Sequence, residues 1–232
     1  MKAIGERIFD KDEIVGFLKC NLRKEIYSVY YVFNTLYLLN EELPDMEEFL
    51  IQRLDEALDR NFKNFIFKKG TTFTYSFETP NVLREMYLIV SSLNLLGKRI
   101  RKVRGFIKKL RKNGGYGVSF PNIRDTYYCI SILNEVDGKV LSFIRQHECR
   151  EGGFAKSPGG YPPYLEETFY ALKCFKIANS SYFSNKTLNY LYSLQNRDGG
   201  FRRSVHGGIS TLEDTYYAVC SIKLLNQMKQ NY

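Results

Sequence analysis

The chain has 232 residues, of which 44% are hydrophobic and 15% aromatic, a composition that excludes a disordered chain and suffices for a substantial core. Lys and Arg number 34 against 25 Asp and Glu, and the net charge of +9 favours an anionic partner such as a diphosphate, a nucleic acid or an anionic lipid, unless it only keeps the protein soluble. The five cysteines are odd in number and include no Cys-x-x-Cys pair, which argues against a disulfide framework and for a reducing cytoplasm.

The N-terminus lacks the apolar core of a secretory signal peptide. The longest uncharged stretch, residues 26–40, is too short and too polar to cross a bilayer. We therefore expect a cytoplasmic protein without a membrane span.

Hydrophobic residues recur at helical spacing, and no segment alternates with period two between turns, so we expect an all-α chain without a sheet. Ten helices are predicted, at residues 11–21, 25–40, 45–59, 81–96, 99–112, 123–136, 138–147, 165–178, 184–195 and 211–227. Residues 98–112 contain nine Lys and Arg around an apolar helical stripe. A solvated basic face is the favoured interpretation of this run, ahead of contact with nucleic acid or a membrane.

A repeat is visible in the second half of the chain. A Gly-Gly-aromatic motif occurs at residues 114–116, 152–154 and 199–201, and each copy leads through a polar loop to an acid-Thr-aromatic motif at 125–127, 167–169 and 214–216. The offset from Phe154 to Glu167 and from Phe201 to Asp214 is 13 residues in both cases. We expect the glycines to allow a left-handed turn after one helix, and the acid to lie in the first turn of the next, where it complements the helix dipole.

The first half of the chain contains degenerate copies of the same pattern, around residues 28 and 85. One hairpin of helices cannot bury its apolar face alone, so neighbouring hairpins must stack. The sequence therefore predicts about five helix hairpins.

The best-formed unit, residues 191–219, resembles the repeat of the protein prenyltransferase β-subunit and squalene/terpene cyclase superfamily, and residues 143–172 are similar to it. The likeness covers residues 100–227 well and 10–97 weakly. It implies an α/α toroid, partial or complete, with 1–232 as a single domain. In catalytic members of that superfamily an inner and an outer ring of helices enclose an aromatic-lined cavity for an isoprenoid, with the diphosphate at a basic rim. Six hairpins are usual there, so five imply an open toroid or one completed by a helical partner subunit.

The metal-binding and acid motifs of this superfamily are absent from this sequence. Protein prenyltransferases hold Zn²⁺ through an Asp-x-Cys pair and a later His, and this sequence has no Asp-x-Cys, so a zinc site is not expected. His147 and Cys149 are a weak alternative, explained more simply as a surface His beside a packing Cys. The Asp-x-Asp-Asp acid motif of the cyclases is also missing. We nominate no catalytic residue.

The resemblance suggests three sets of candidate site residues. Mg²⁺ is a candidate cofactor if the repeat acids converge, although helix capping is the simpler explanation of Asp125, Glu167 and Asp214. A diphosphate needs cations, and the candidates lie in equivalent loops: Lys156, Arg203, His206 and Arg124, with solvated loop residues as the alternative. The aromatic wall of the cavity is predicted from one tyrosine in each repeat, with ordinary packing as the alternative: Tyr31, Tyr128, Tyr170 and Tyr217.

The sequence thus favours a prenyltransferase-like protein that binds an isoprenoid diphosphate in a central cavity, with prenyl transfer as the reaction the family implies. The alternative is a non-catalytic interaction scaffold that kept the toroid and lost the metal. A third hypothesis, nucleic-acid binding through the basic run, is the least favoured. The prenyl acceptor and the length of the isoprenoid are not determined by the sequence.

Overall fold

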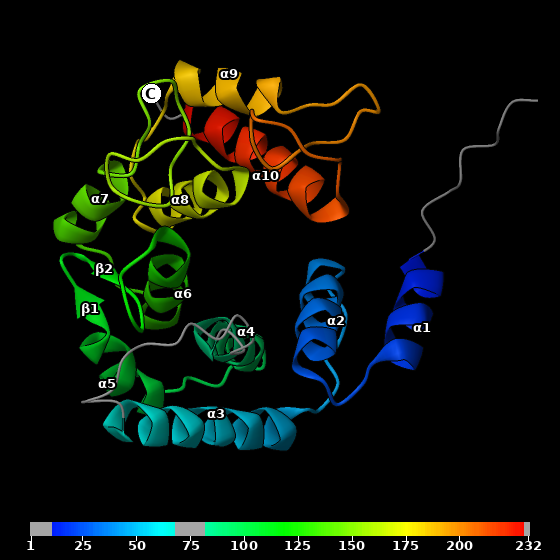
Figure 1. Ribbon diagram of the computed structural model, residues 1–232. Coiled ribbons are helices and arrows are strands. Elements are labelled where there is room, and N and C mark those ends of the chain that lie inside the picture. The colour runs from blue at the N-terminus through cyan, green and yellow to red at the C-terminus, as the bar shows by residue number, and fades with distance from the viewer. Residues whose placement is uncertain (1–10, 68–81, 230–232) are drawn as a thin grey trace, which may run out of the picture. The chain divides into compact units, whose positions relative to one another are not determined.

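The computed structural model describes residues 11–67 and 82–229, and within these ranges the chain forms ten helices (Figure 1). They are α1 (Lys11–Asn21), α2 (Ile26–Leu38), α3 (Glu47–Phe67), α4 (Val82–Leu95), α5 (Lys102–Lys109), α6 (Ile123–Leu133), α7 (Gly138–Arg145), α8 (Leu165–Ile177), α9 (Asn185–Ser193) and α10 (Leu212–Lys229). Each predicted helix is present, and the all-α class is confirmed. No helix within the described ranges is long and apolar enough to cross a membrane.

The expectation of no sheet is wrong at one place. Strand β1 (Arg111–Lys112) pairs antiparallel with β2 (Gly115–Tyr116), and Lys112 lies opposite Gly115. The two residues of the connecting turn, Asn113 and Gly114, have φ of 49° and 90°. Two consecutive positive φ values are typical of the tight turn that joins hairpin strands, and Asn-Gly is its preferred sequence. The strands are too short to show a period-two pattern.

The chain divides into two compact units, Met1–Val103 and Arg104–Tyr232, and each is described by itself. In the first, α2 and α3 both pack against α4, and α1 packs against α2. The single domain expected over 1–232 stays a prediction.

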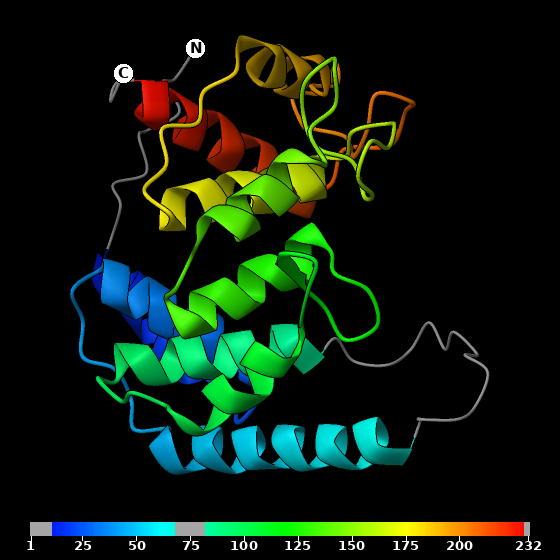
Figure 2. The same ribbon diagram turned by 90° about the vertical axis from the view of Figure 1, so that its left-hand side faces the viewer.

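In the second unit the helices form two layers (Figures 1 and 2). Helix α8 lies between α6 and α10 in one layer, and α7 and α9 pack outside it, against α8 and α10 respectively. The core of this unit contains large buried side chains, including Phe154 and Phe175, whose ring centres lie 6.1 Å apart. This alternation of helices agrees with the inner and outer positions that the family resemblance implies, and we call the layer of α6, α8 and α10 the inner layer.

A threonine explains why the two motifs of each repeat occur together. In all three clear copies, the side-chain oxygen of the motif threonine accepts a hydrogen bond from the backbone N–H of the motif aromatic residue. The pairs are Tyr116 with Thr126 at 2.9 Å, Phe154 with Thr168 at 3.0 Å and Phe201 with Thr215 at 3.1 Å. The bond satisfies a backbone donor that the turn would otherwise leave without a partner.

The first glycine of each Gly-Gly pair takes the left-handed backbone that the sequence predicted. Gly114, Gly152 and Gly199 have φ of 90°, 98° and 87°. Gly152 is also closely packed, because a Cβ there would lie 2.4 Å from the backbone of Lys186. The requirement for glycine at this position is therefore both conformational and steric.

Candidate functional site

A charged cluster lies at the N-terminal ends of α6 and α8, beside the loop that leads to α10. Glu166, the second residue of α8, lies between two guanidinium groups: its Oε1 is 3.6 Å from Arg124 Nη1, and its Oε2 is 3.6 Å from Arg203 Nη2. The side chain of Glu166 is 22% exposed, whereas those of Arg124 and Arg203 are 43% and 54% exposed. One carboxylate thus holds two cations from different repeats within reach of solvent.

A third cation joins this cluster through an aromatic ring. Lys156 Nζ lies 4.7 Å, and Arg203 Cζ 5.8 Å, from the centre of the Tyr164 ring, both at distances typical of cation–π contacts. The backbone N–H of Leu165 donates to the carbonyl of Arg203 at 3.0 Å, which fixes the second loop against the start of α8. Lys156, Arg203 and Arg124 are therefore neighbours.

His206, the fourth residue predicted for the diphosphate, lies in the same loop as Arg203 but contacts a different ring. Its imidazole meets Tyr161 edge to face, with the ring centres 5.8 Å apart, and it is exposed.

The three repeat acids do not form one metal site. Within residues 11–67 and 82–229 no group of three or more His, Cys, Asp or Glu side chains could hold a metal ion, so the expected convergence of Asp125, Glu167 and Asp214 on Mg²⁺ is not met. Two of these acids serve as caps. Asp125 N donates to Asn122 Oδ1 at 2.8 Å while Asn122 Nδ2 donates to Asp125 Oδ2 at 2.9 Å, a reciprocal pair that closes the helix start.

Thr211 and Asp214 repeat this arrangement at the start of α10, with bonds of 3.0 and 2.8 Å. Glu167 has no such partner, because the residue three positions earlier is Tyr164, whose side chain makes no cap hydrogen bond. Glu167 Oε2 is buried and lacks a hydrogen bond within the described residues. Burial, and next the charge of Glu166, raise the pKa of the Glu167 carboxyl.

Three of the four tyrosines predicted to line the cavity form a chain of hydroxyl groups across the inner layer. The Tyr128 and Tyr170 hydroxyls lie 2.9 Å apart, and those of Tyr170 and Tyr217 3.5 Å apart. Tyr217 donates to Glu213 Oε1 at 2.8 Å. All three rings are buried, and burial is the main reason that the pKa of Tyr170 and of Tyr217 is raised. The chain joins α6, α8 and α10.

Tyr31, the fourth of these tyrosines, belongs to the other unit. It is 57% exposed, and its ring meets that of Tyr30 edge to face at 5.4 Å. In that unit it is Tyr30 whose hydroxyl lies 3.2 Å from another, that of Tyr87.

A cavity of about 260 Å³ opens beside the charged cluster. Its walls are polar and carry three carboxylates and one guanidinium: Glu166, Arg203, Thr211, Glu213, Asp214 and Tyr217. The excess of carboxylates makes the cavity itself a poor place for an anion. Arg203 faces it from one side, and on its other side Arg203 meets the ring of Tyr164 together with Lys156.

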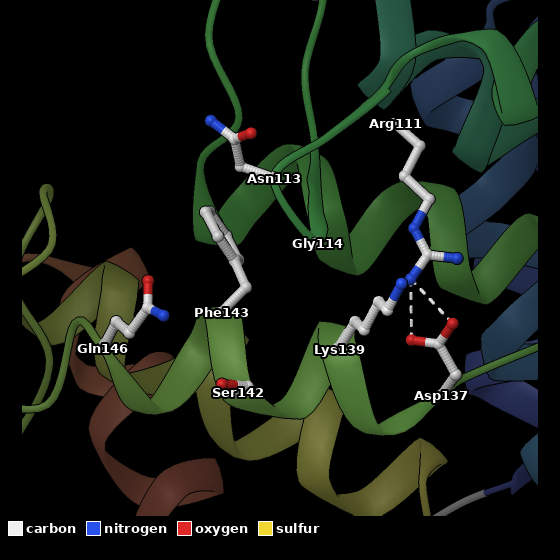
Figure 3. A pocket seen from close by; sticks show the side chains of 8 residues that line it. All are labelled: Arg111, Asn113, Gly114, Asp137, Lys139, Ser142, Phe143 and Gln146. Carbon is white, nitrogen blue, oxygen red and sulfur yellow. Dashed lines mark hydrogen bonds and ion pairs between the residues drawn. The ribbon is translucent and has the colours of Figure 1, made fainter.

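A larger hollow of about 580 Å³ lies between the β-hairpin and α7 (Figure 3). Arg111 donates to both oxygens of Asp137, each at 2.7 Å, and Lys139 and Phe143 are among the other residues that line the hollow. The Arg111 hydrogen bond is the main cause that lowers the pKa of the Asp137 carboxyl. None of the predicted site residues lies here.

The comparisons with known proteins bear on this arrangement. The sequence model of the prenyltransferase alpha-alpha toroid domain matches residues 19–159 and, overlapping them, 128–231. The chain belongs to this α/α-toroid family. A similar solved structure is Candida albicans protein geranylgeranyltransferase-I complexed with GGPP, with a TM-score of 0.63 and 15% identity, covering 94% of this chain and 78% of that chain. At this identity the likeness establishes the fold alone. A search of the curated proteins gives no significant match.

Glu166 of the charged cluster and Glu213 of the cavity beside it were not among the sequence candidates. Both immediately precede the acid of their motif, and Arg124 precedes Asp125 in the same way. A charged residue at this position in all three copies was the signal available in the sequence. This sequence pattern does not identify the ion-pair partners of Glu166, because they are arginines from two other repeats.

Contacts of His147 and of the basic run bear on two further expectations. His147 is not a surface residue: it is 1% exposed, its Nδ1 lies 2.8 Å from the Phe143 carbonyl oxygen, and burial lowers its pKa. Five of the nine cations of the basic run form ion pairs within the protein, and nucleic-acid binding through this run stays a hypothesis. Its ion pairs join Lys98 to Glu47, Lys102 to Asp55, Arg104 and Lys108 to Glu135, and Arg111 to Asp137.

Proposed function

We propose that this toroid protein binds an isoprenoid diphosphate, with the diphosphate held by Lys156, Arg203 and Arg124 and with His206 at the edge of the site. The observation that carries the proposal is the position of Glu166, a carboxylate that lies between two guanidinium groups of different repeats. Guanidinium forks match phosphate oxygens as well as they match carboxylates. A diphosphate would take over both arginines and leave Glu166 to turn toward solvent.

The surroundings of these cations support an isoprenoid rather than a free inorganic anion. Helices α8 and α10 present Phe169, Tyr170 and Tyr217 next to one another, and Phe169 stacks on Tyr217 with ring centres 4.6 Å apart. Aromatic rings with a few fixed hydroxyls are typical walls of pockets for apolar ligands. We propose that the prenyl chain lies against this aromatic wall. Prenyl transfer would then use the three cations to stabilise the departing diphosphate.

Binding is tested by titrating the full chain with farnesyl and geranylgeranyl diphosphate, and with inorganic pyrophosphate as the headgroup alone. Arg203→Gln is expected to weaken binding of all three by about tenfold or more, because a charge-assisted hydrogen bond is lost. Glu166→Gln is expected to strengthen pyrophosphate binding roughly fivefold, because a competing carboxylate is removed. Lys176→Gln is the matched control, since Lys176 is an exposed lysine in the last turn of α8.

Absence of saturable binding of any of the three ligands at high micromolar concentration would refute the proposal. Pyrophosphate binding without any gain from the prenyl chain would restrict it to an anion site. Appearance of the prenyl group on an added thiol acceptor, with release of one pyrophosphate, would identify a transferase rather than a binding protein.

The alternative, a non-catalytic scaffold, is favoured by a different observation. The hydroxyls of Tyr128, Tyr170 and Tyr217 are bonded to one another and to Glu213, which leaves the inner layer of this unit closed by its own side chains. A scaffold of this kind would engage a helical partner subunit. Purification from the source cell in complex with a second chain, together with no effect of prenyl diphosphates on the melting temperature, would select this function.

A further inference from the structure

The loops that join the two motifs of each repeat carry exposed apolar side chains. Phe120 is 72%, Tyr161 66% and Ile209 81% exposed, the three highest values among the large hydrophobic residues of the described chain. Each lies in one copy of the same loop, after the Gly-Gly-aromatic motif and before the acid. We call Phe120, Tyr161 and Ile209 the tip residues. Their recurrence in repeat-equivalent loops distinguishes these three side chains from singly scattered surface residues, which need no explanation.

The three loops project from the same side of the second unit (Figure 2, green, yellow-green and orange). Two of them touch: the Tyr161 ring meets His206, and the chain at Arg203 is bonded to the start of α8. The tips therefore form one surface of separate projections rather than three unrelated positions.

Side-chain hydrogen bonds tie down the backbone beside two of these tips, Phe120 and Ile209. Lys112 Nζ donates to the carbonyls of Val118 and Ser119, at 3.3 and 3.1 Å, directly before Phe120. On the third loop Asn196 Nδ2 donates to the Gly208 carbonyl at 3.3 Å and to Ser210 Oγ at 3.0 Å, on either side of Ile209. Since the backbone beside these tips is tied down, their exposure is built into the loops.

The charge of these loops has one sign. Residues 117–122, 155–164 and 202–211 contain Lys156, Arg202, Arg203 and His206 and no Asp or Glu. The whole chain, these loops included, carries a net charge of +9. Apolar and aromatic tips flanked by cations fit the boundary of an anionic bilayer, where rings enter the headgroup region and cations meet lipid phosphates. A flat protein partner would leave separate projections poorly packed.

We propose that this protein docks peripherally on an anionic membrane through Phe120, Tyr161 and Ile209, with Lys156 and the neighbouring arginines contacting lipid headgroups. The proposal shares Lys156 and Arg203 with the proposed diphosphate site, but its tests change only the tip residues, which are not part of that site. Peripheral docking would bring an apolar ligand or a lipid-modified product to the protein without a membrane-spanning helix.

The sequence contains no tryptophan, so a single introduced indole reports on its own surroundings. The Phe120→Trp protein is mixed with vesicles of phosphatidylcholine, or of phosphatidylcholine with about one third phosphatidylserine. We expect a blue shift of its emission with the anionic vesicles only, reversed by high salt. Tyr192→Trp, on α9 and 51% exposed, is the matched control and should show no shift.

Co-sedimentation with the same vesicles provides the second readout. The triple variant Phe120→Ser, Tyr161→Ser, Ile209→Ser should lose at least about tenfold in vesicle affinity at unchanged melting temperature. The control triple variant is Tyr37→Ser, Tyr192→Ser, Val219→Ser. These are exposed apolar positions on α2, α9 and α10, respectively. This variant should bind vesicles as the unaltered chain does. Equal binding by the tip variant, or no binding of the unaltered chain to anionic vesicles, would overturn the proposal. A tip-dependent oligomer without vesicle binding would assign the surface to a protein partner instead.

Discussion

The side-chain oxygen of Thr168 lies 3.0 Å from the backbone nitrogen of Phe154, and this hydrogen bond connects the two motifs of one repeat. The same hydroxyl donates to the Tyr164 carbonyl at 2.8 Å, so it serves the turn and the helix start together. Position 168 therefore requires a side chain that both donates and accepts. Tyr116 with Thr126, and Phe201 with Thr215, repeat the relationship.

Replacing the motif threonine by the isosteric valine should destabilise the protein in proportion to burial. Thr168→Val leaves the buried N–H of Phe154 without its partner, at a cost of about 1–3 kcal/mol. Thr126 is equally buried and Thr215 only half-buried, so Thr215→Val should cost less. Urea unfolding measures the three differences, with Thr35→Val on α2 as the control at a partly exposed helix position. Equal costs for Thr168 and Thr35 would contradict the interpretation.

The two glycines that begin the second and third motifs should respond differently to alanine. Both have a positive φ, but a Cβ at Gly152 would clash with the Lys186 backbone at 2.4 Å, whereas a Cβ at Gly199 meets nothing within 4 Å. Gly199→Ala should cost about 1 kcal/mol from backbone strain alone. Gly152→Ala should cost clearly more, and thermal unfolding will rank the two. A ranking in the opposite order would show that the third hairpin is the more tightly packed one.

The hydroxyl chain of the inner layer should stabilise the fold. Tyr170→Phe removes the central hydroxyl and deprives both Tyr128 and Tyr217 of a hydrogen bond in a buried place, so we expect a loss of about 1–3 kcal/mol. Tyr190→Phe is a matched control, because Tyr190 is also buried but lies outside this chain of tyrosine hydroxyls. This change should cost less than Tyr170→Phe. Similar losses in both variants would mean that the chain of hydroxyls contributes no stability of its own.

Glu167 should make stability depend on pH with an unusual sign. Burial raises the pKa of its carboxyl in the folded state, so the folded protein binds this proton more tightly than the unfolded chain. Stability should then fall as the pH rises from the unfolded-state pKa of glutamate through the raised folded-state value. Glu167→Gln is expected to stabilise the protein at pH 7 and to have little effect below about pH 4, where both states are protonated.

Asp137 provides the opposite case for the same experiment. The hydrogen bond from Arg111 lowers its pKa, so its contribution is present above the unfolded-state pKa and is lost as the pH falls through the folded-state value. Asp137→Asn should therefore reduce stability at pH 7 and lose this effect in acid. Guanidinium unfolding of both variants across the pH range checks the two signs, and a common sign would disprove one of the assignments.

Much of the local structure could be predicted from the sequence because it rests on local chemistry. Helical periodicity located all ten helices, and the Gly-Gly pairs located the left-handed turns. The roles of the three repeat acids were also encoded by nearby residues, although the acid-Thr-aromatic motif alone does not distinguish one acid from another. Asn122 and Thr211 stand three residues before Asp125 and Asp214 and can cap with them, whereas Tyr164 precedes Glu167 and cannot.

The sequence by itself thus determined the repeat and its helices, since both follow from spacing within a few dozen residues, and the resemblance of its motifs indicated the family. Only the tertiary structure decided that Glu166 lies between Arg124 and Arg203, that three tyrosines share their hydroxyl bonds, and that the repeat acids stay apart. These relationships join side chains of different repeats. They depend on how neighbouring hairpins are packed and on which rotamers that packing allows, and a period along one chain carries no information about either.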